Sequence, residues 1–490
     1  MSEEVPSLRR RLEEQMPSAR LSKDPGSAVR RQRRTARLRA ALTVFAAAAV
    51  AVVGPSIWLR AGHTAHPTAA ASDAVPRKVD TPWMWQATVQ QAPPGRAALL
   101  LGGDGLGLRG IDLLDHEGKV AVVGRDGSYR MLLYHGAAVV PGEDVLLSPD
   151  GRYVVQSFVA GGPRGFLVVT DLTDGTSRAL PGPQGRDCCG QPVAWAPDGR
   201  AVLALELPRE PIGWDPITQI GVLPARPVLI NLESKSATPL LDTVGDVHRL
   251  RTASLAAFSP DGKRIALRAG DQLHLVDRAG RTLWTATLGE RRHLAGLGAF
   301  SPDGTRIATV TLDGCLRSCD TAALASRTWH VGYLDAATGQ DTSGPAVDTV
   351  RGMALRVLGW RGGTDLVALR YQPERGAYSE GPVGWNDTGW WETGEVTLVA
   401  LRPGGGTEIL IDSPGEILAM DVPRDLLEAG RFGGPSHPPA PFPARPVILA
   451  VLVPAAVPVI AAVCGLLLWW RRRRRRSPRR GDAAAHVGGV

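Results

Sequence analysis

The stretch "AFSPDGKRIAL", Ala257–Leu267, decides the fold, because the chain repeats it almost unchanged as "AFSPDGTRIAT" at Ala299–Thr309. Ser-Pro-Asp-Gly suits a type I turn. Proline presets φ at the second position, aspartate accepts hydrogen bonds from nearby backbone N–H groups, and glycine adopts the left-handed conformation. Apolar residues precede the turn, and alternating apolar residues such as Ile265 and Leu267 follow it. Each copy is therefore predicted to be a β-hairpin.

The phrase recurs in less regular forms along the chain. Two further turns lie at Ser148–Gly151 and Ala196–Gly199, and weaker echoes run over Ile111–Val123 and Val357–Leu369. After each turn comes a second β run that ends in polar residues, such as "QLHLVDRAG" at Gln272–Gly280, and then a further short strand. Four strands in each unit of roughly 40–60 residues are typical of a propeller blade.

These Ser-Pro-Asp-Gly hairpins, each followed by an aliphatic strand that ends in Asp, resemble the WD40-like repeats of TolB-type β-propellers. The clear motifs cover about four blades, and the weaker spacing extends the likeness across residues 84–422. The resemblance implies an all-β propeller that serves more often as a binding platform than as an enzyme. It is a likeness of fold and identifies no partner.

The number of blades follows from the inner strands that precede the turns. They fall near Ile111, Val145, Val193, Leu255, Leu297 and Leu355. Two unassigned runs, "PWMWQATV" and "RAALLL", come before the first unit, and "GEILAMDV" (Gly415–Val422) follows the sixth. Joining these runs from both chain ends closes the ring and removes open sheet edges. We therefore expect seven blades, with six as the alternative.

Two uncharged apolar segments are long enough to cross a bilayer, Ala40–Leu59 and Pro446–Trp470. A membrane-spanning helix needs roughly 20 such residues. Basic runs lie outside both segments, at Arg30–Arg39 and Arg471–Arg476, which places both termini in the cytoplasm. The first segment is expected to be an uncleaved anchor, and a cleaved signal peptide is the alternative. The predicted organisation is a basic tail (1–39), a span (40–59), a linker (60–83), the propeller (84–422), a Pro/Gly-rich linker (423–445), a span (446–470) and an Arg-rich tail (471–490).

The net charge of +8 belongs to the two tails. Residues 1–39 carry 11 basic and 5 acidic side chains, and residues 471–490 carry 8 and 1, so the tails hold +6 and +7. The remainder, mainly residues 60–445, then carries −5. A mildly acidic middle region argues against nucleic-acid binding, whereas Arg-rich tails favour anionic lipid. High Ala, Gly and Arg suggest a high-GC bacterium, and we expect a plasma-membrane protein with most of its chain outside the cytoplasm.

Long irregular connections gather on one face of the predicted propeller. The Ser-Pro-Asp-Gly turns occupy one face, here named the turn face, and their aspartates are expected to be structural: Asp150, Asp198, Asp261 and Asp303. Connections from second to third strands, and from blade to blade, leave on the other face, here named the insertion face. It carries the long segments Leu207–Arg226, Asp313–Ser326, Tyr371–Gly394 and Pro181–Gly190. Such loops on a rigid scaffold are usual places for binding.

Aromatic residues in these connections are the candidate binding residues. They are Trp385, Trp390, Trp391, Trp214 and Tyr378. Aromatic side chains are enriched at recognition hot spots. The alternative is that the tryptophans pack over their own loop or a neighbouring blade.

Four cysteines also lie on the insertion face. Cys188 is adjacent to Cys189, and Cys315 precedes Cys319 by four residues. An even number outside the cytoplasm favours disulfides. Three pairings are possible, and Cys315–Cys319 is preferred as a loop clip, with the adjacent pair either bridged or free. The spacing is unfamiliar for a thiolate metal site, so no metal is predicted.

The leading hypothesis is a membrane-tethered, extracytoplasmic propeller that binds a protein, peptide or glycan at the cell envelope. One alternative is a sensor that couples an external ligand to the basic tails. Another is an envelope enzyme that uses the propeller funnel. No G-x-S-x-G, H-E-x-x-H or EF-hand motif occurs, so we expect no catalytic residues and no cofactor.

Overall fold

The computed structural model describes residues 73–82, 87–103, 119–132, 140–157, 163–210, 212, 214–215, 220–246, 254–379, 392–415, 417–435 and 463. The chain divides into two compact units, Thr68–Ala450 and a unit formed by Met1–Pro67 with Val451–Val490. Apart from Val463, all described residues belong to the first unit. Both predicted membrane spans lie outside the described residues except at Val463, and no helix within the described part is long and apolar enough to cross a membrane.

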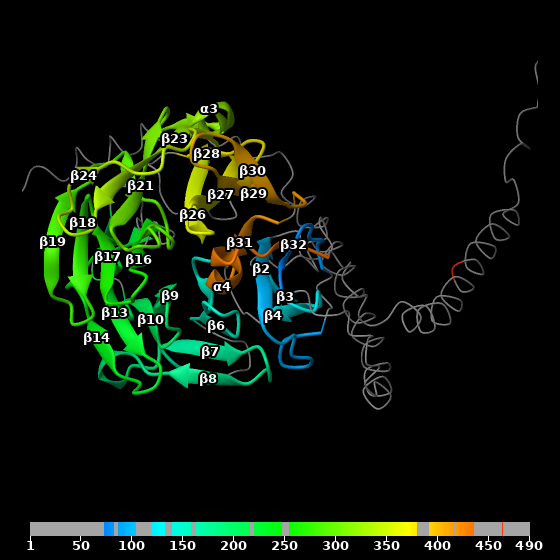
Figure 1. The fold of residues 1–490 in the computed structure, drawn as a ribbon. Coiled ribbons are helices and arrows are strands. Elements are labelled where there is room, and N and C mark those ends of the chain that lie inside the picture. The colour runs from blue at the N-terminus through cyan, green and yellow to red at the C-terminus, as the bar shows by residue number, and fades with distance from the viewer. Residues whose placement is uncertain are drawn as a thin grey trace, which may run out of the picture. The chain divides into compact units, whose positions relative to one another are not determined.

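Within the described residues, six antiparallel sheets are arranged in a ring as a six-bladed β-propeller (Figure 1). From inner to outer strand, blade 1 consists of β31 (Ala419–Asp421), β2 (Ala97–Gly103), β3 (Lys119–Gly124) and β4 (Tyr129–Leu132). Blade 2 consists of β5 (Val145–Leu147), β6 (Tyr153–Gln156), β7 (Leu167–Asp171) and β8 (Ser177–Leu180). Blade 3 consists of β9 (Gly190–Trp195), β10 (Ala201–Glu206), β13 (Pro224–Asn231) and β14 (Ala237–Pro239), with β15 (Gly245–Asp246) also paired to β13.

The second half of the ring repeats this pattern. Blade 4 consists of β16 (Ala256–Phe258), β17 (Arg264–Ala269), β18 (Gln272–Asp277) and β19 (Thr282–Thr287). Blade 5 consists of β20 (Arg292–Leu294), β21 (Arg306–Asp313), β23 (Thr328–Asp335) and β24 (Asp341–Thr342), with β25 (Val350–Arg351) also paired to β23. Blade 6 consists of β26 (Ala354–Arg361), β27 (Asp365–Pro373), β29 (Thr393–Leu401) and β30 (Thr407–Asp412).

The ring closes by pairing its two chain ends, but it does so in six blades, so the prediction of seven is wrong and the six-bladed alternative is confirmed. Strand β31, from the predicted run Gly415–Val422, pairs directly with β2, with Leu101 opposite Met420. The run "RAALLL" is therefore the second strand of blade 1, and "KVAVV" is the third. Of the run "PWMWQATV", residues 83–86 lie outside the described residues, and in the described part Thr88 forms an isolated parallel bridge to Met131 in the outer strand of blade 1.

The repeated turns form through the side chains that the motif supplies. Ser259 Oγ donates to Asp261 Oδ1 at 2.6 Å and accepts from the backbone N–H of Arg264 at 2.9 Å. Gly262 has φ +66°, the left-handed conformation that the turn requires. The same Ser-to-Asp bond occurs at the copies that begin with Ser148 and Ser301. The copy at Ala196–Gly199 lacks this hydroxyl and keeps the backbone bond from Gly199 to Ala196 at 2.9 Å.

The apolar core lies between neighbouring blades. Leu100 and Val122 of blade 1, for example, join one buried cluster with Val145 and Val154 of blade 2. Comparable clusters join blades 2 and 3 and blades 3 and 4. Strand β2 is buried along its whole length, which explains its nearly uninterrupted apolar sequence. Each fully buried leucine or valine contributes about 1.5–3 kcal/mol, so contact between blades is a main source of the stability of the ring.

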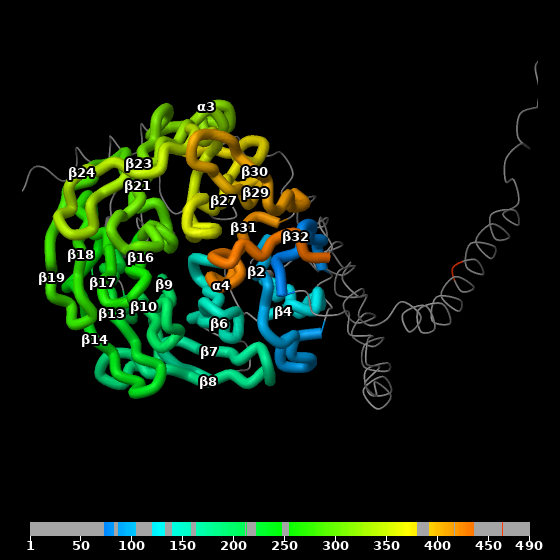
Figure 2. The backbone as a smooth tube through the Cα atoms, in the orientation of Figure 1, coloured from blue at the N-terminus to red at the C-terminus, as the bar shows by residue number. Residues whose placement is uncertain are grey.

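Both ends of the described unit lie on the turn face. Helix α4 (Arg424–Glu428) follows β31, and the N–H of Asp425 donates to the carbonyl of Pro149 in the turn of blade 2 at 2.9 Å. Leu426 and Leu427 of this helix are buried. Strand β1 (Val75–Pro76) then pairs in parallel with β32 (Phe432–Gly434) (Figure 2). Parts of both predicted linkers are therefore folded onto the propeller, because their apolar residues are buried there.

Candidate functional site

The long connections leave the propeller on one face, as expected from the alternation of antiparallel strands. The segment between β10 and β13 includes the short strands β11 (Trp214–Asp215) and β12 (Ile220–Gly221). The segment between β21 and β23 includes β22 (Cys319–Asp320) and α3 (Thr321–Ser326). The segment after β27 includes β28 (Tyr378–Ser379), and the link from blade 2 to blade 3 contains the 3-10 helix η1 (Pro183–Gly185).

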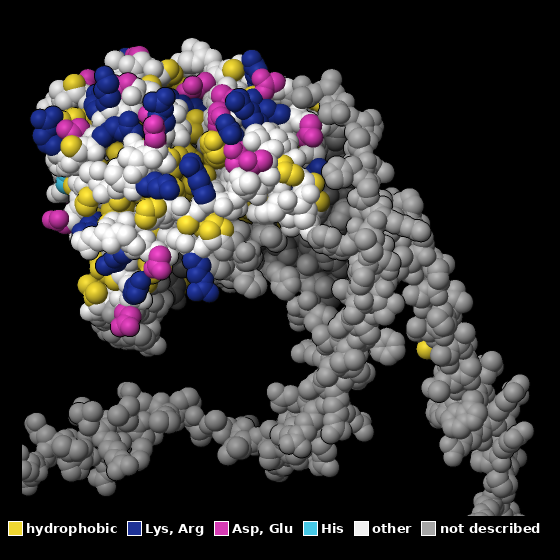
Figure 3. Space-filling view, turned by 90° about the horizontal axis from the view of Figure 1, so that it is seen from below, with side chains coloured by type: hydrophobic (Ala, Val, Ile, Leu, Met, Phe, Trp, Pro, Cys, Tyr) yellow, Lys and Arg dark blue, Asp and Glu magenta, His cyan; other side chains and the backbone are white. Residues whose placement is uncertain are grey.

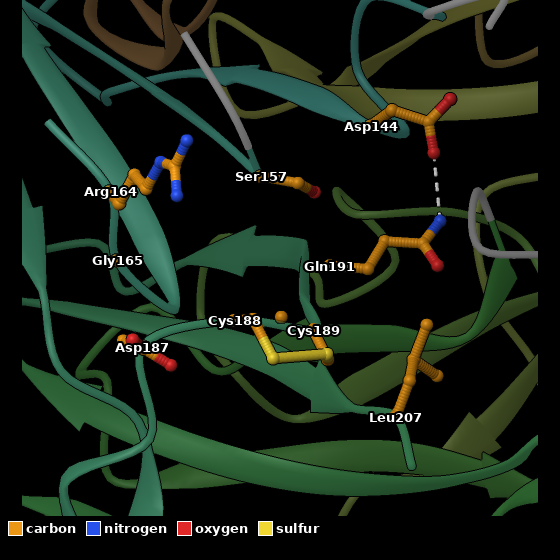
Figure 4. Close-up of a pocket in the computed structure, with 10 residues that line it drawn as sticks. Asp144, Ser157, Arg164, Gly165, Asp187, Cys188, Cys189, Gln191 and Leu207 are labelled. Atoms are coloured by element: carbon orange, nitrogen blue, oxygen red, sulfur yellow. Dashed lines mark hydrogen bonds between the residues drawn. A yellow bond between two sulfur atoms is a disulfide. The ribbon is translucent and has the colours of Figure 1, made fainter. Parts of the chain in front are cut away.

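A cavity of about 500 Å³ opens on this face between blades 2 and 3. Four segments line it: the approach to β5, the connection from β6 to β7, the link from blade 2 to blade 3, and the end of β10. The lining residues are Asp144, Ser157, Arg164, Gly165, Asp187, Cys188, Cys189, Gly190, Gln191 and Leu207 (Figure 4). All of these segments belong to the insertion face.

Asp144 and Gln191 point toward one another on one side of this cavity (Figure 4). Gln191 Nε2 donates to Asp144 Oδ1 at 2.7 Å, and the N–H of Val140 donates to Asp144 Oδ2 at 3.2 Å. Burial, together with the neighbouring charge of Glu143, raises the pKa of Asp144 to about 7, and the two hydrogen bonds only partly oppose this rise. Near neutral pH this carboxyl group therefore exists in both protonation states.

Behind Asp144, a buried arginine joins three blades. Arg356 of β26 is fully buried, and its Nη2 donates to the carbonyl of Met420 at 2.7 Å. Its Nη1 lies 3.5 Å from Glu143 Oε1. Burial raises the pKa of Asp421 to about 6, although the charge of Arg356 opposes this rise. The network links the segment that carries Asp144 to the strand that closes the ring.

A disulfide between the adjacent residues Cys188 and Cys189, whose Cα atoms are 3.8 Å apart, also lines the cavity, close to Gln191 (Figure 4). Cys189 has φ +70°, a left-handed conformation that is costly for a residue other than glycine. Its carbonyl accepts from the N–H of Leu207 at 2.9 Å. At Gly190 an added Cβ would lie 2.4 Å from the carbonyl oxygen of Phe166, so glycine allows this close approach.

The rim of the cavity carries charged side chains of both signs. Arg164 and Asp187 are exposed, and Asp187 Oδ1 accepts from Arg209 at 3.2 Å. Outside the residues that line the cavity, Arg186 and Arg226 both contact the buried carboxylate of Glu206, at 3.2 and 2.5 Å. On the face drawn in Figure 3, basic and acidic side chains are likewise interspersed over the described surface.

A second cavity, of about 340 Å³, lies on the same face where blade 6 meets blade 1. Gln372, Glu374, Arg375 and Glu395 are among its lining residues. The hydroxyl of Thr393 also lines it, is buried, and has no hydrogen-bond partner among the described residues. The lining of the second cavity is therefore more polar than the part of the first cavity that the disulfide forms.

The insertions of blades 5 and 6 are joined to one another. Strand β22 pairs with β28, with Cys319 opposite Ser379 and Asp320 opposite Tyr378. A disulfide joins Cys315 to Cys319, the pairing preferred above, and Cα atoms 5.9 Å apart suit it. These two connections thus form one built surface.

The structure describes some of the predicted binding and disulfide residues and not others. Cys188 and Cys189 line the first cavity, and Tyr378 lies on β28 and is 48% exposed. Trp385, Trp390 and Trp391 lie outside the described residues, and Trp214 is described only by its place in β11.

The four turn aspartates lie in their turns and bind backbone N–H groups. The hydroxyl of Ser301, followed by the N–H of Thr305, lowers the pKa of Asp303 to about 2. Within the described residues, no group of three or more His, Cys, Asp or Glu side chains is arranged to hold a metal ion.

Sequence reasoning missed Asp144, Gln191 and Arg164. A signal for Asp144 was present: the acidic pair Glu143–Asp144 directly precedes an apolar inner strand. Nothing in the sequence indicates that Gln191, 47 residues later, meets it.

No protein-family model matches the chain, and no curated protein matches it. Among solved structures, it is similar to an oligogalacturonate lyase in complex with manganese, at 14% identity over 68% of this chain and 77% of that chain, with a TM-score of 0.37. It is similar to TolB from Acinetobacter baumannii at 16% identity over 67% of this chain and 65% of that chain, with a TM-score of 0.35. The dihydro-heme d1 dehydrogenase NirN matches at 10% identity over 76% and 85% of the two chains, with a TM-score of 0.31. These likenesses carry no statement about activity, and the chain is described by its fold, an all-β, six-bladed propeller with TolB among its structural neighbours.

Proposed function

We propose that the chain is a binding module, not an enzyme, and that its insertion face takes up a protein, peptide or glycan at the cell envelope. One observation carries this proposal: both cavities described above open on the face where the long connections gather. Clefts with an apolar wall and a few polar groups are the usual form of ligand sites. Here the disulfide and Leu207 supply the apolar wall, and Asp144, Gln191 and Arg164 supply polar groups.

The turn face is less suited to this role because it is already occupied. Its tight turns are closed by their own hydrogen bonds, as at Ser259 and Asp261. Helix α4 and the β1–β32 pair cover part of it, held by contacts of Asp425 with Pro149 and with Arg125. The insertion face thus remains as the broad irregular surface of the described unit.

The attachment of the propeller supports the same orientation. Arg125 and Arg431 both contact Asp73, so the first described residue of the unit and the strand near its end, β32, lie side by side on the turn face. We propose that these spans anchor the chain in the plasma membrane with both termini in the cytoplasm and Arg-rich tails on anionic lipid. The same pairing of chain ends favours a second candidate role, a sensor that passes an external binding event to both spans.

Photo-crosslinking in native membranes tests the binding face. A photoreactive amino acid is introduced at Arg164 or Tyr378 on the insertion face, and at Lys263 or Thr305 on the turn face as matched exposed controls. We expect a discrete crosslinked partner from the first pair only. Crosslinks that arise only from the turn face, or equally from both faces, would overturn the proposal.

A further inference from the structure

The two disulfides of the insertion face differ in what they do for the fold. Cys319 is fully buried and lies in β22, and Arg327, also fully buried, donates to the carbonyl of Cys315 at 2.9 Å and contacts Cys319 Sγ at 3.6 Å. The Cys315–Cys319 bond therefore closes a loop that packs against the core and against the neighbouring insertion. Such a bond has a structural role.

The Cys188–Cys189 bond closes no loop, because its two residues are adjacent in sequence. A disulfide stabilises a fold mainly by shortening the loops of the unfolded chain, and this gain grows with the number of residues enclosed. Other contacts already hold the segment: the N–H of Leu207 binds the Cys189 carbonyl, and Gly190 pairs with Glu206 across β9 and β10. These contacts hold the segment in place independently of the sulfur–sulfur bond.

Both sulfur atoms belong to side chains that are only partly buried and that face the cavity of about 500 Å³. Exposed disulfides are the ones that exchange with incoming thiols, because the attacking thiolate needs access to a sulfur atom. Arg164 lines the same cavity and, among the described residues, is its one lining residue with a positive charge. The negative charge of Asp187, beside Cys188, is compensated by Arg209 at 3.2 Å.

We propose that Cys188–Cys189 is an exchangeable, redox-active disulfide that oxidises a small dithiol entering this cavity, whereas Cys315–Cys319 stays oxidised. One thiolate of the dithiol attacks a protein sulfur, the Cys188–Cys189 bond breaks, and a mixed disulfide forms while the released cysteine takes up a proton. The second substrate thiol then attacks its own half of the mixed disulfide and releases the other cysteine. Two electrons and two protons pass to the protein, and the substrate leaves as a disulfide.

The left-handed backbone of Cys189, at φ +70°, fits this role. Non-glycine residues persist in that conformation where the surrounding structure imposes it, and such positions cluster at functional sites. Reduction places two thiols in the cavity wall where one disulfide stood, so the cavity that faces the ligand changes with redox state. The exchange is a stoichiometric oxidation of one dithiol per chain and not a catalysed turnover, so it is compatible with the binding module proposed above, and the two proposals are tested by separate experiments.

The test is a graded reduction of the full-length folded protein in detergent with dithiothreitol. Exposed thiols are blocked with iodoacetamide at each concentration, and the four cysteines are followed by peptide mass spectrometry. We expect Cys188 and Cys189 to be labelled at a dithiothreitol concentration at least tenfold below that needed for Cys315 and Cys319. One equivalent of oxidised dithiothreitol per chain, measured by chromatography, accompanies the labelling.

Two variants keep the test specific. The double variant C188S/C189S is expected to form no oxidised dithiothreitol at the low dithiothreitol concentration. Its circular dichroism spectrum and thermal midpoint are expected to equal those of the wild type. The matched variant C315S/C319S is expected to form one equivalent of oxidised dithiothreitol per chain, as the wild type does, and to unfold at a lower temperature. Labelling of all four cysteines together, or of Cys315 and Cys319 first, overturns the proposal. The wild-type titration gives this answer even where a variant fails to fold.

Discussion

Gln191 Nε2 donates a 2.7 Å hydrogen bond to Oδ1 of Asp144, and this bond joins the segment that enters blade 2 to the inner strand of blade 3. Because the N–H of Val140 donates to the other carboxylate oxygen, both oxygens of Asp144 have a donor. Burial and the charge of Glu143 nevertheless raise its pKa to about 7. The cavity therefore contains a group whose charge changes near neutral pH.

This raised pKa predicts a specific pH dependence of stability. From pH 4 to about 7 the unfolded state has released the Asp144 proton while the folded state retains it, so stability falls as pH rises through this window. The shift from 3.8 to about 7 sets an upper bound of about 4 kcal/mol on the loss, and partial exposure reduces the expectation to on the order of 1–2 kcal/mol.

The variant Asp144→Asn removes this titration. Its stability at a single pH is not diagnostic, because the asparagine NH₂ group would face the N–H of Val140. The difference in thermal midpoint between pH 5 and pH 8 is diagnostic, and we expect it to be smaller than in the wild type. Glu233→Gln, at an exposed position, is the control and should leave the difference unchanged. An equal difference in wild type and Asp144→Asn would contradict the prediction.

Arg356 predicts a second effect on stability. Replacing it with methionine leaves Glu143 and Asp421 buried without their common cation, which costs about 3–5 kcal/mol where such charges cannot relax. We expect a marked fall in thermal midpoint for Arg356→Met. Adding Glu143→Gln to that variant should recover part of the loss, since one of the two uncompensated carboxylates is then neutral. If the double variant is as unstable as the single variant, Arg356 does not compensate the charge of the Glu143 carboxylate.

The Ser-Pro-Asp-Gly turns predict a third effect. In Ser301→Ala the hydroxyl no longer donates to Asp303, and the N–H of Arg306 loses its acceptor at 2.9 Å. An unsatisfied buried donor costs about 1–3 kcal/mol, so the free energy of unfolding should fall by that order. Lys263→Ala, on the exposed side of an equivalent turn, should change it by less than about 0.5 kcal/mol. Equal effects in denaturant titrations would refute the structural role assigned to the serine.

The repeats make most of the fold predictable, because each Ser-Pro-Asp-Gly copy carries its own turn chemistry and its own strands. The blade number was not predictable from them. The first blade has no such turn: its inner strand, β31, comes from the far end of the chain and pairs with Leu101 through Met420. The sequence predicts a seventh blade from β31 and β2, separate from the blade that contains β3. The pairing of β2 with β3 places all three strands in one sheet, and the sequence does not show this pairing.

The candidate site was predictable only in part. Connection lengths identify the insertion face, because they depend on strand alternation alone. The partners of Asp144 do not follow from the sequence, since Gln191 and Arg356 reach the same region from blades 3 and 6. Contacts of this kind depend on how the ring closes and have no local sequence signal.

The insertion after β28 predicts an effect on binding. Replacing Trp385, Trp390 and Trp391 together with alanine should reduce partner capture in the crosslinking experiment at least tenfold, because aromatic anchors supply much of the energy of an interface. Trp284→Ala on the outer strand of blade 4 is the matched control for loss of a tryptophan. Unchanged capture by a folded triple variant would remove these residues from the binding surface.

The two predicted spans, one on each side of the propeller in the sequence, lead to a prediction about topology. Single cysteines are introduced at Ser7, at Lys263 and at Ala483, and intact cells are treated with a membrane-impermeant maleimide. We expect labelling at Lys263 in intact cells, and labelling at Ser7 and Ala483 only after permeabilisation, because Arg-rich flanks remain on the cytoplasmic side of a span. The unmodified protein corrects for its native thiols. Labelling of either tail in intact cells, or protection of Lys263, would exclude a propeller that is held outside the membrane by two spans.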